Sequence, residues 1–318
     1  MNRRKALLTT SVLTLAFGVA PATVWVYRHK FSPGKRASND MPLASAQVVS
    51  AAEQPPHSDT LSLFDDIFTK DDRLSYRGYV IEKSQDRGED SWSASLKKGS
   101  REVAKFASGW NREWTNFGLF PFISREPRQL VVEQYSGGAH CCYSYWIYEL
   151  DAQAPRLLFD SGKYGTGNQL MHLDVDSDGV VELTHSVMAF DYFHMSHASS
   201  VFPQAVFAYD KKAGEYRPAN ARFSQVVLST MEDDLKELEA LKARGNPDND
   251  EIYSERYFSA VLQVTLNYIY AGQQEKGWQF FNREYRTHEG ISREKMRAEI
   301  EETLRGEPVY KYIYSTKE

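Results

Sequence analysis

One short stretch of the sequence, LDVDSDGVVEL at positions 173–183, has the spacing of a cation-binding loop. Its candidate ligands are the carboxylates of Asp174, Asp176, Asp178 and Glu182 and the backbone carbonyl oxygen of Val180. Hard oxygen ligands of this kind suit a calcium ion, and Gly179 allows the sharp turn that gathers them. Because three aspartates this close would repel one another without a cation, we predict a calcium site here.

The predicted loop differs from an EF-hand and resembles another calcium loop. An EF-hand needs a bidentate glutamate at its twelfth position, where this chain has His185, and β-type sequence flanks the loop. The pattern resembles the calcium loops of FG-GAP (integrin-type) propeller blades, in which D-x-D-x-D-G-x-x-D precedes a strand. Glu182 stands in place of the final aspartate. The resemblance implies a structural calcium that holds a blade together, and it implies no catalysis.

A second candidate site lies in YSGGAHCCYSYW, where a Gly-Gly pair precedes His140, Cys141 and Cys142. Two buried thiols could face opposite sides of a strand, because adjacent side chains alternate there. A vicinal disulfide is also possible, although consecutive Cα atoms lie only ~3.8 Å apart and ordinary disulfides prefer ~4.4–6.8 Å. The thiols could instead bind a soft metal together with His140, or one of them could act as a nucleophile. All four interpretations remain open.

A third polar group lies in FDYFHMSHASS and contains Asp191, His194 and His197. Two histidines three positions apart can share a metal ion on a helix, but the context here indicates a loop after a strand. If this loop meets the cysteine-containing loop, the histidines could complete a soft-metal site. The two loops therefore form one candidate polar cluster.

These loops have to be positioned by β structure. Between Leu61 and Pro218, aromatic and β-branched residues recur at alternate positions in short runs such as QLVVEQYS. The glycine-containing segments LKKGSREV and YDKKAGEYRP are typical of tight turns between such runs. The pattern predicts antiparallel hairpins, arranged as propeller-like blades or as a sandwich.

Two segments of this β region look like copies of one unit. Val131-Val132-Glu133 and Val180-Val181-Glu182 are each followed by a histidine-containing loop and an aromatic strand that ends in aspartate. The two segments begin 49 positions apart, a spacing typical of a four-stranded propeller blade. Residues 128–218 therefore resemble two units of the FG-GAP class. The block that contains SGGAHCC and DGVVELTHSVMAFDYF before an aromatic strand is also similar to exported bacterial proteins of unknown activity.

From Phe223 the periodicity becomes helical. Apolar residues follow one another at spacings of three and four from Val226 to Leu241, and Gly245 ends the segment. Two more helices are predicted before Ser292, which should cap a last helix that stops at Gly306 and Pro308. This region reads as a small bundle with an aromatic core.

The N-terminus reads as an export segment. Basic residues in MNRRK precede an uncharged run to Tyr27, which could be a cleaved signal or an uncleaved membrane anchor. We predict an α+β chain with a signal or anchor over 1–30, a flexible linker over 31–59, an antiparallel β domain over 60–223 and a helical domain over 224–318.

Composition narrows the possible functions. The chain is 42% apolar and 25% charged, as in globular proteins, and its net charge of −5 argues against a nucleic-acid partner. We expect an extracytoplasmic binding or scaffolding protein of the cell envelope, with a protein or glycan partner and membrane contact through the N-terminal segment only. The alternative is a metal- or thiol-dependent envelope enzyme that uses the loops at 137–142 and 191–197.

Overall fold

A computed structural model describes residues 61–64, 66–86, 91–109, 111–138, 143–151, 153–245 and 250–315. The predicted signal or anchor over 1–30 and the linker over 31–59 lie outside these residues. His140, Cys141 and Cys142 also lie outside them. No helix in the described part of the chain is both long and apolar enough to cross a membrane.

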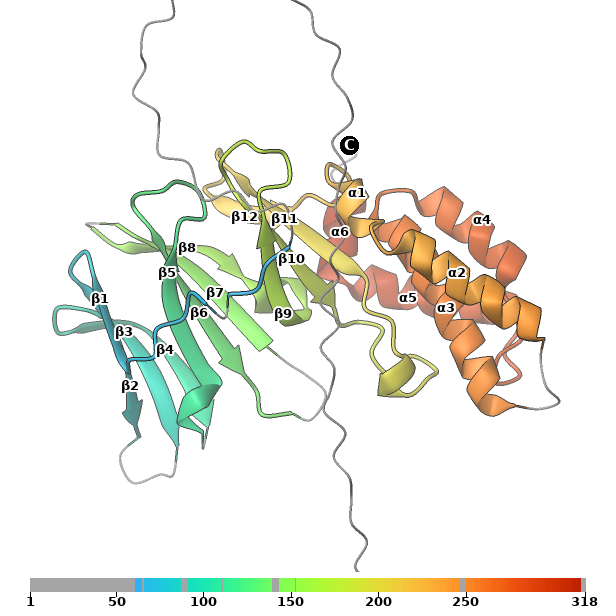
Figure 1. Ribbon diagram of the computed structural model, residues 1–318, viewed down its shortest axis with the longest axis horizontal. Helices are drawn as coiled ribbons and strands as arrows, with labels where there is room; N and C mark the ends of the chain where they lie inside the picture. Colours follow the sequence, from blue (N-terminus) through green and yellow to red (C-terminus); the bar gives the residue numbers. More distant parts are fainter. Residues whose placement is uncertain are drawn as a thin grey trace, which may run out of the picture. The chain divides into compact units, whose positions relative to one another are not determined.

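Three antiparallel sheets follow one another along the chain, and each has four strands joined in sequence order (Figure 1). The first sheet consists of β1 (Arg73–Tyr76), β2 (Tyr79–Gln85), β3 (Trp92–Lys98) and β4 (Arg101–Gly109). Its β3–β4 hairpin turns at Gly99, whose φ of +59° is the left-handed conformation that the turn prediction requires.

The second sheet follows the short 3-10 helix η1 (Arg112–Trp114). Its strands are β5 (Thr115–Phe120), β6 (Gln129–Tyr135), β7 (Tyr143–Leu150) and β8 (Pro155–Asp160). The predicted strand QLVVEQYS corresponds to β6, and the aromatic strand predicted after it corresponds to β7.

The third sheet follows the 3-10 helix η2 (Ser161–Tyr164). Its strands are β9 (Thr166–Leu173), β10 (Glu182–Val187), β11 (Gln204–Asp210) and β12 (Glu215–Pro218). A third 3-10 helix, η3 (His197–Ser199), lies in the connection between β10 and β11.

The repeated sequence pattern corresponds to equivalent strands. Glu133 lies in β6 and Glu182 begins β10, and each is the second strand of its sheet. The aromatic runs that follow them form β7 and β11, the third strands. The similarity detected in the sequence therefore reflects a repeated position in the sheets.

The second sheet is buried on both faces because its strand side chains alternate. Leu130 and Val132 of β6 belong to a core shared with the first sheet, including Tyr79. Val131 between them belongs to a larger core that contains Leu183 of the third sheet and the helices. The sheets therefore stack face to face in chain order, with the helices packed beyond the third (Figure 1).

Ser62 and Phe68, which precede the first sheet, pair with edge strands of the third and second sheets. Ser62 pairs with His172 in β9, and Phe68 pairs with Gly118 in β5. The backbones of Ser62 and His172 exchange two hydrogen bonds, of 3.1 and 3.0 Å. Because β5 and β9 are both edge strands, the pairing covers backbone groups that would otherwise lie open.

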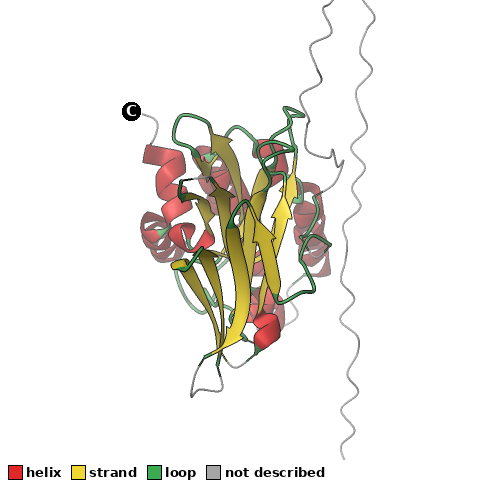
Figure 2. Cartoon of the chain, turned by 90° about the vertical axis from the view of Figure 1, so that its left-hand side faces the viewer, coloured by secondary structure: helices red, strands yellow, loops and turns green. Residues whose placement is uncertain are grey.

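The C-terminal region is helical, as predicted, and lies behind the strands when viewed from the first sheet (Figure 2). Its helices are α1 (Ser224–Val227), α2 (Met231–Arg244), α3 (Glu251–Tyr270), α4 (Gln274–Glu284), α5 (Arg293–Gly306) and α6 (Pro308–Ser315). The predicted α+β layout, with a β region followed by helices, is confirmed.

Two details of the helical prediction are wrong. The first predicted helix breaks after Val227, where a turn separates α1 from α2. The predicted stop of α5 at Gly306 is confirmed, but a further helix that was not predicted, α6, begins at Pro308, because a proline at the first helical position loses no backbone hydrogen bond. Ser292 does cap α5, since its side chain accepts a hydrogen bond from the Lys295 amide.

The helices share the larger core with the second and third sheets. The predicted aromatic core of the helical region is buried; it contains Tyr257, Phe258, Leu262, Leu266, Trp278 and Phe281, with Tyr268 half-buried beside them. The same cluster contains Val206 and Phe207 of β11. The β and helical regions therefore pack as one unit, although their secondary structure changes between β12 and α1.

Candidate metal site

The predicted calcium loop joins β9 to β10. Asp174 closes its turn, because Oδ1 accepts a hydrogen bond from the Asp178 amide and Oδ2 accepts one from the Gly179 amide, both at 3.1 Å. Ser177 and Gly179 have φ values of +59° and +85°. The sharp turn predicted at Gly179 is therefore present, and it brings the two ends of the acidic segment together.

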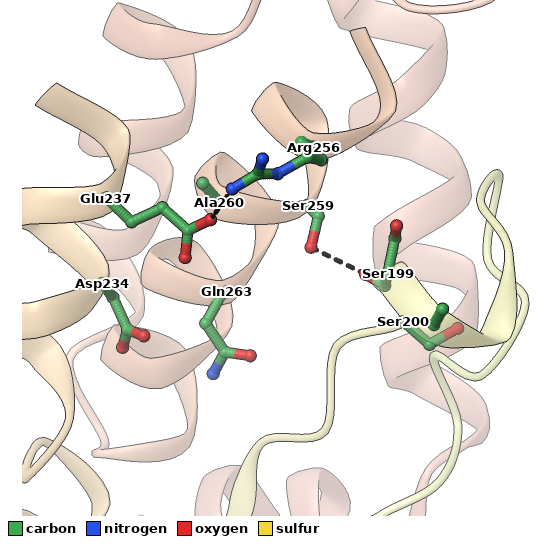
Figure 3. A pocket seen from close by; sticks show the side chains of 9 residues that line it. Ser199, Ser200, Asp234, Glu237, Arg256, Ser259, Ala260 and Gln263 are labelled. Carbon is green, nitrogen blue, oxygen red and sulfur yellow. Dashed lines mark hydrogen bonds and ion pairs between the residues drawn. The ribbon is translucent and has the colours of Figure 1, made fainter. Parts of the chain in front are cut away.

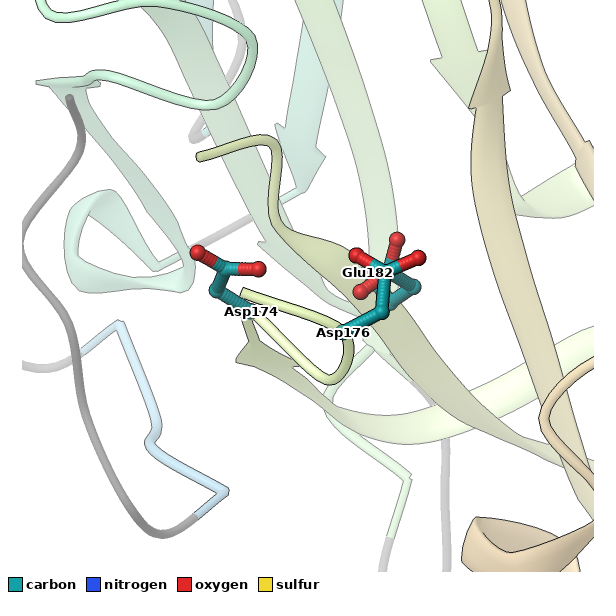
Figure 4. Close-up of side chains that lie close together, drawn as sticks. All are labelled: Asp174, Asp176 and Glu182. Atoms are coloured by element: carbon teal, nitrogen blue, oxygen red, sulfur yellow. The ribbon is translucent and has the colours of Figure 1, made fainter. Parts of the chain in front are cut away.

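Three of the predicted ligands can meet one ion. One oxygen atom each from Asp174, Asp176 and Glu182 lies within 4.8 Å of the others (Figure 4). Calcium binds oxygen at about 2.3–2.6 Å, so two ligands on opposite sides of the ion lie at most about 5.2 Å apart. The separation fits a shared calcium ion, and among the described residues this is the only such group of three or more acidic, histidine or cysteine side chains.

The other two predicted ligands have a different position. Asp178 is outside that group of three, and its Oδ1 accepts a hydrogen bond of 2.9 Å from the Val180 amide. This contact shapes the turn and leaves one carboxylate oxygen for other partners. Coordination by Asp178 and by the carbonyl of Val180 stays a prediction.

Burial and one ion pair set the electrostatics of the loop. Glu182 is 3% exposed, and burial, with the three aspartates, raises its pKa to about 7 against the lowering effect of the Val175 amide, which donates to it at 2.9 Å. Arg222, from the connection between β12 and α1, forms an ion pair with Asp176. Arg222 could not be found by local spacing, because it lies 46 positions from its partner.

His185, at the twelfth position of the loop, is not a ligand candidate. Its side chain is fully buried in β10. Nε2 lies 2.9 Å from the carbonyl oxygen of Asn168, to which it donates, and Nδ1 lies 2.8 Å from the hydroxyl of Thr166. Burial lowers the pKa of this imidazole to about 4, so the histidine is a neutral part of the sheet core.

The 191–197 loop makes contacts that the sequence did not predict. Nδ1 of His197 lies 2.7 Å from Oδ1 of Asp191. His194 contacts two carboxylates of the helical region, with Nδ1 3.0 Å from Glu289 and Nε2 2.7 Å from Glu299. Both ring nitrogens of His194 therefore have partners, and a metal ion would have to displace one of them.

These contacts bear on the predicted soft-metal cluster. Asp191, His194 and His197 do not form a metal-binding group of three by themselves within the described residues. The other members, His140, Cys141 and Cys142, lie outside those residues, so a site shared by the two loops stays a prediction. Glu289 and Glu299 could not be found by local spacing, because they are 95 and 105 positions from His194.

Comparison with protein-family models, with curated proteins and with solved structures finds no match to this chain. The resemblance to FG-GAP loops therefore rests on the residues of the 174–182 segment.

Proposed function

We propose that this protein binds a protein or glycan partner at the cell envelope and that one calcium ion holds its β region in shape. The observation that carries the calcium site is the set of carboxylate oxygens from Asp174, Asp176 and Glu182, which lie within 4.8 Å of one another at the entry to β10. Three successive four-stranded sheets support a propeller-like arrangement of FG-GAP type.

The surroundings of the loop support a structural role. Its last residue, Val181, donates a backbone hydrogen bond of 2.9 Å to Phe122, beyond the end of β5, and accepts one of 3.0 Å from the Tyr216 hydroxyl of β12. Arg222 connects Asp176 to the chain that enters α1. An ion in this loop would therefore stabilise contacts among two sheets and the start of the helices.

The test is direct calcium counting together with thermal unfolding. We expect one calcium per chain, no zinc, and a higher melting temperature in calcium than in chelator. For a ligand that binds only the folded state, free calcium at 100 times Kd adds about 2.7 kcal/mol of stability.

Asp174→Asn should lose both the bound calcium and the calcium-dependent shift. Asp151→Asn, which removes an exposed aspartate after β7, should keep both. Equal melting temperatures of the wild-type protein in calcium and in chelator would contradict the proposal, as would bound zinc.

The alternative, a metal- or thiol-dependent enzyme, is favoured by one contact. The Asp191 carboxylate lies 2.7 Å from Nδ1 of His197, and a carboxylate in that place can orient an imidazole as a general base. Alkylation of Cys141 and Cys142, combined with zinc analysis, tests it. Unreactive thiols and the absence of zinc would count against an enzyme.

A further inference from the structure

A polar cavity of about 320 Å³ lies between the 3-10 helix η3 and the helices α2 and α3 (Figure 3), and no residue of the acidic loop lines it. The side chains that matter for its chemistry are Ser200, Asp234, Glu237, Arg256, Ser259 and Gln263. A volume at the lower end of the usual range for ligand sites suits a small molecule.

The η3 side of the cavity is held in place by hydrogen bonds. Ser259 of α3 donates from its hydroxyl to the carbonyl of Ser199 at 2.7 Å. Ser196 donates to Glu255 of α3 at 2.6 Å, and the Ser200 hydroxyl donates to the Ser196 carbonyl at 3.1 Å. The loop is therefore fastened to α3 at two points, and the cavity has a defined wall.

The opposite wall offers hydrogen-bond acceptors. The Thr230 hydroxyl and the Asn267 amide both donate to the same oxygen of Asp234, Oδ2, each at 2.9 Å. In the described part of the chain, the other oxygen of Asp234 accepts no hydrogen bond. Gln263 donates from Nε2 to Asn267 at 2.9 Å, so its carbonyl oxygen is also available to a ligand.

The charges of the lining leave one carboxylate without a cation. Arg256 pairs with Glu237 at 2.8 Å, and both side chains are about half exposed at the rim. Asp234 lies deeper. Burial raises its pKa to about 6, and the nearby carboxylates of Glu237 and Asp233 act in the same direction. A cationic ligand group beside Asp234 would offset this cost.

We propose that this cavity binds a small hydroxylated amine of amino-sugar size, with its ammonium group beside Asp234 and its hydroxyl groups donating to Gln263 and the serines. An anionic ligand would meet the carboxylate of Asp234, since Arg256 is already paired with Glu237, and an apolar ligand would leave polar groups unpaired. The cavity is separate from the acidic loop, so it would bind its ligand with or without calcium.

Titration calorimetry with glucosamine, with glucose as the uncharged counterpart, tests the proposal. We expect saturable glucosamine binding, with glucose at least about 10-fold weaker because it lacks the charge-assisted hydrogen bond. Chelator should leave the glucosamine affinity unchanged, which separates this test from the calcium test. No saturable binding of glucosamine, or equal binding of both sugars, would overturn it.

Three variants test whether glucosamine binds in this cavity. Asp234→Asn keeps an oxygen acceptor for Thr230 and Asn267 but removes the charge, and it should weaken glucosamine binding about 10-fold. Gln263→Met conserves side-chain length and should also weaken it. Glu239→Gln removes the same charge from α2 outside the lining and should not. Full affinity in both Asp234→Asn and Gln263→Met would show that the sugar binds elsewhere.

Discussion

Acid should destabilise this protein through His185, and the size of the effect can be worked from its surroundings. The imidazole is fully buried in β10, and burial lowers its pKa to about 4 from an ordinary value of 6.5. The unfolded chain therefore binds a proton that the folded protein excludes. The neutral, buried imidazole therefore contributes its full share of the free energy of unfolding above pH 6.5, and this contribution is lost as the pH falls through 4.

Between pH 8 and pH 5 the linkage relation gives a loss of about 2 kcal/mol for this one histidine. His172, which packs against Phe64 and Phe120, has its pKa lowered to about 4 by burial and adds a loss in the same direction. Glu182 acts in the opposite sense, because its raised pKa adds stability as the pH falls. Only a comparison between variants therefore isolates His185.

The informative change is His185→Gln, which removes the titrating group and keeps a polar side chain in the core. Urea unfolding at pH 8, 7, 6 and 5, followed by tryptophan fluorescence, gives the free energy of unfolding at each pH. The variant should be less stable than the wild-type protein at pH 8, and its further loss on going to pH 5 should be smaller by about 2 kcal/mol.

Thr166→Val is the matched control, because it removes the hydroxyl beside Nδ1 and leaves the buried imidazole. It should lower the stability and keep the wild-type dependence on pH. Two results would contradict a titrating His185: an equal loss of stability between pH 8 and pH 5 in His185→Gln and the wild-type protein, or an equally flat pH profile in Thr166→Val.

Two further predictions concern the close packing at Gly118 and the helix cap at Asp250. In Gly118→Ala, the new Cβ would lie 2.3 Å from the carbonyl oxygen of Ile67, so we expect a loss of about 1–3 kcal/mol in urea unfolding, whereas Gly306→Ala, with open space around it, should cost nothing. Equal stability of the two variants would contradict the close approach. Asp250→Ala removes the side chain that caps α3 at the Tyr253 amide and should cost about 1 kcal/mol; an unchanged melting temperature would show that the cap is dispensable.

Local sequence determined the features that depend on near neighbours. The turns at Gly99 and Gly214, both with positive φ, were identified because hairpin geometry favours glycine there. The same holds for the cap at Ser292 and for the turn of the acidic loop, which depends on Asp174 and Gly179. In each case the partner lies within a few residues.

Tertiary structure decided the features that depend on distant partners. The strand β5 contains Gly118, which weakens a strand by propensity but is required here because the backbone of Ile67 crosses it.

The sites divide in the same way. The spacing of the acidic loop indicated a cation site, but Arg222 reaches Asp176 only because the chain after β12 returns to the loop. The helices pack against the 191–200 loop. This packing brings Glu289 and Glu299 into contact with His194 and forms the cavity beside Asp234. Local spacing specifies turns and caps, whereas contacts between segments far apart in the chain are specified only by how the whole core packs.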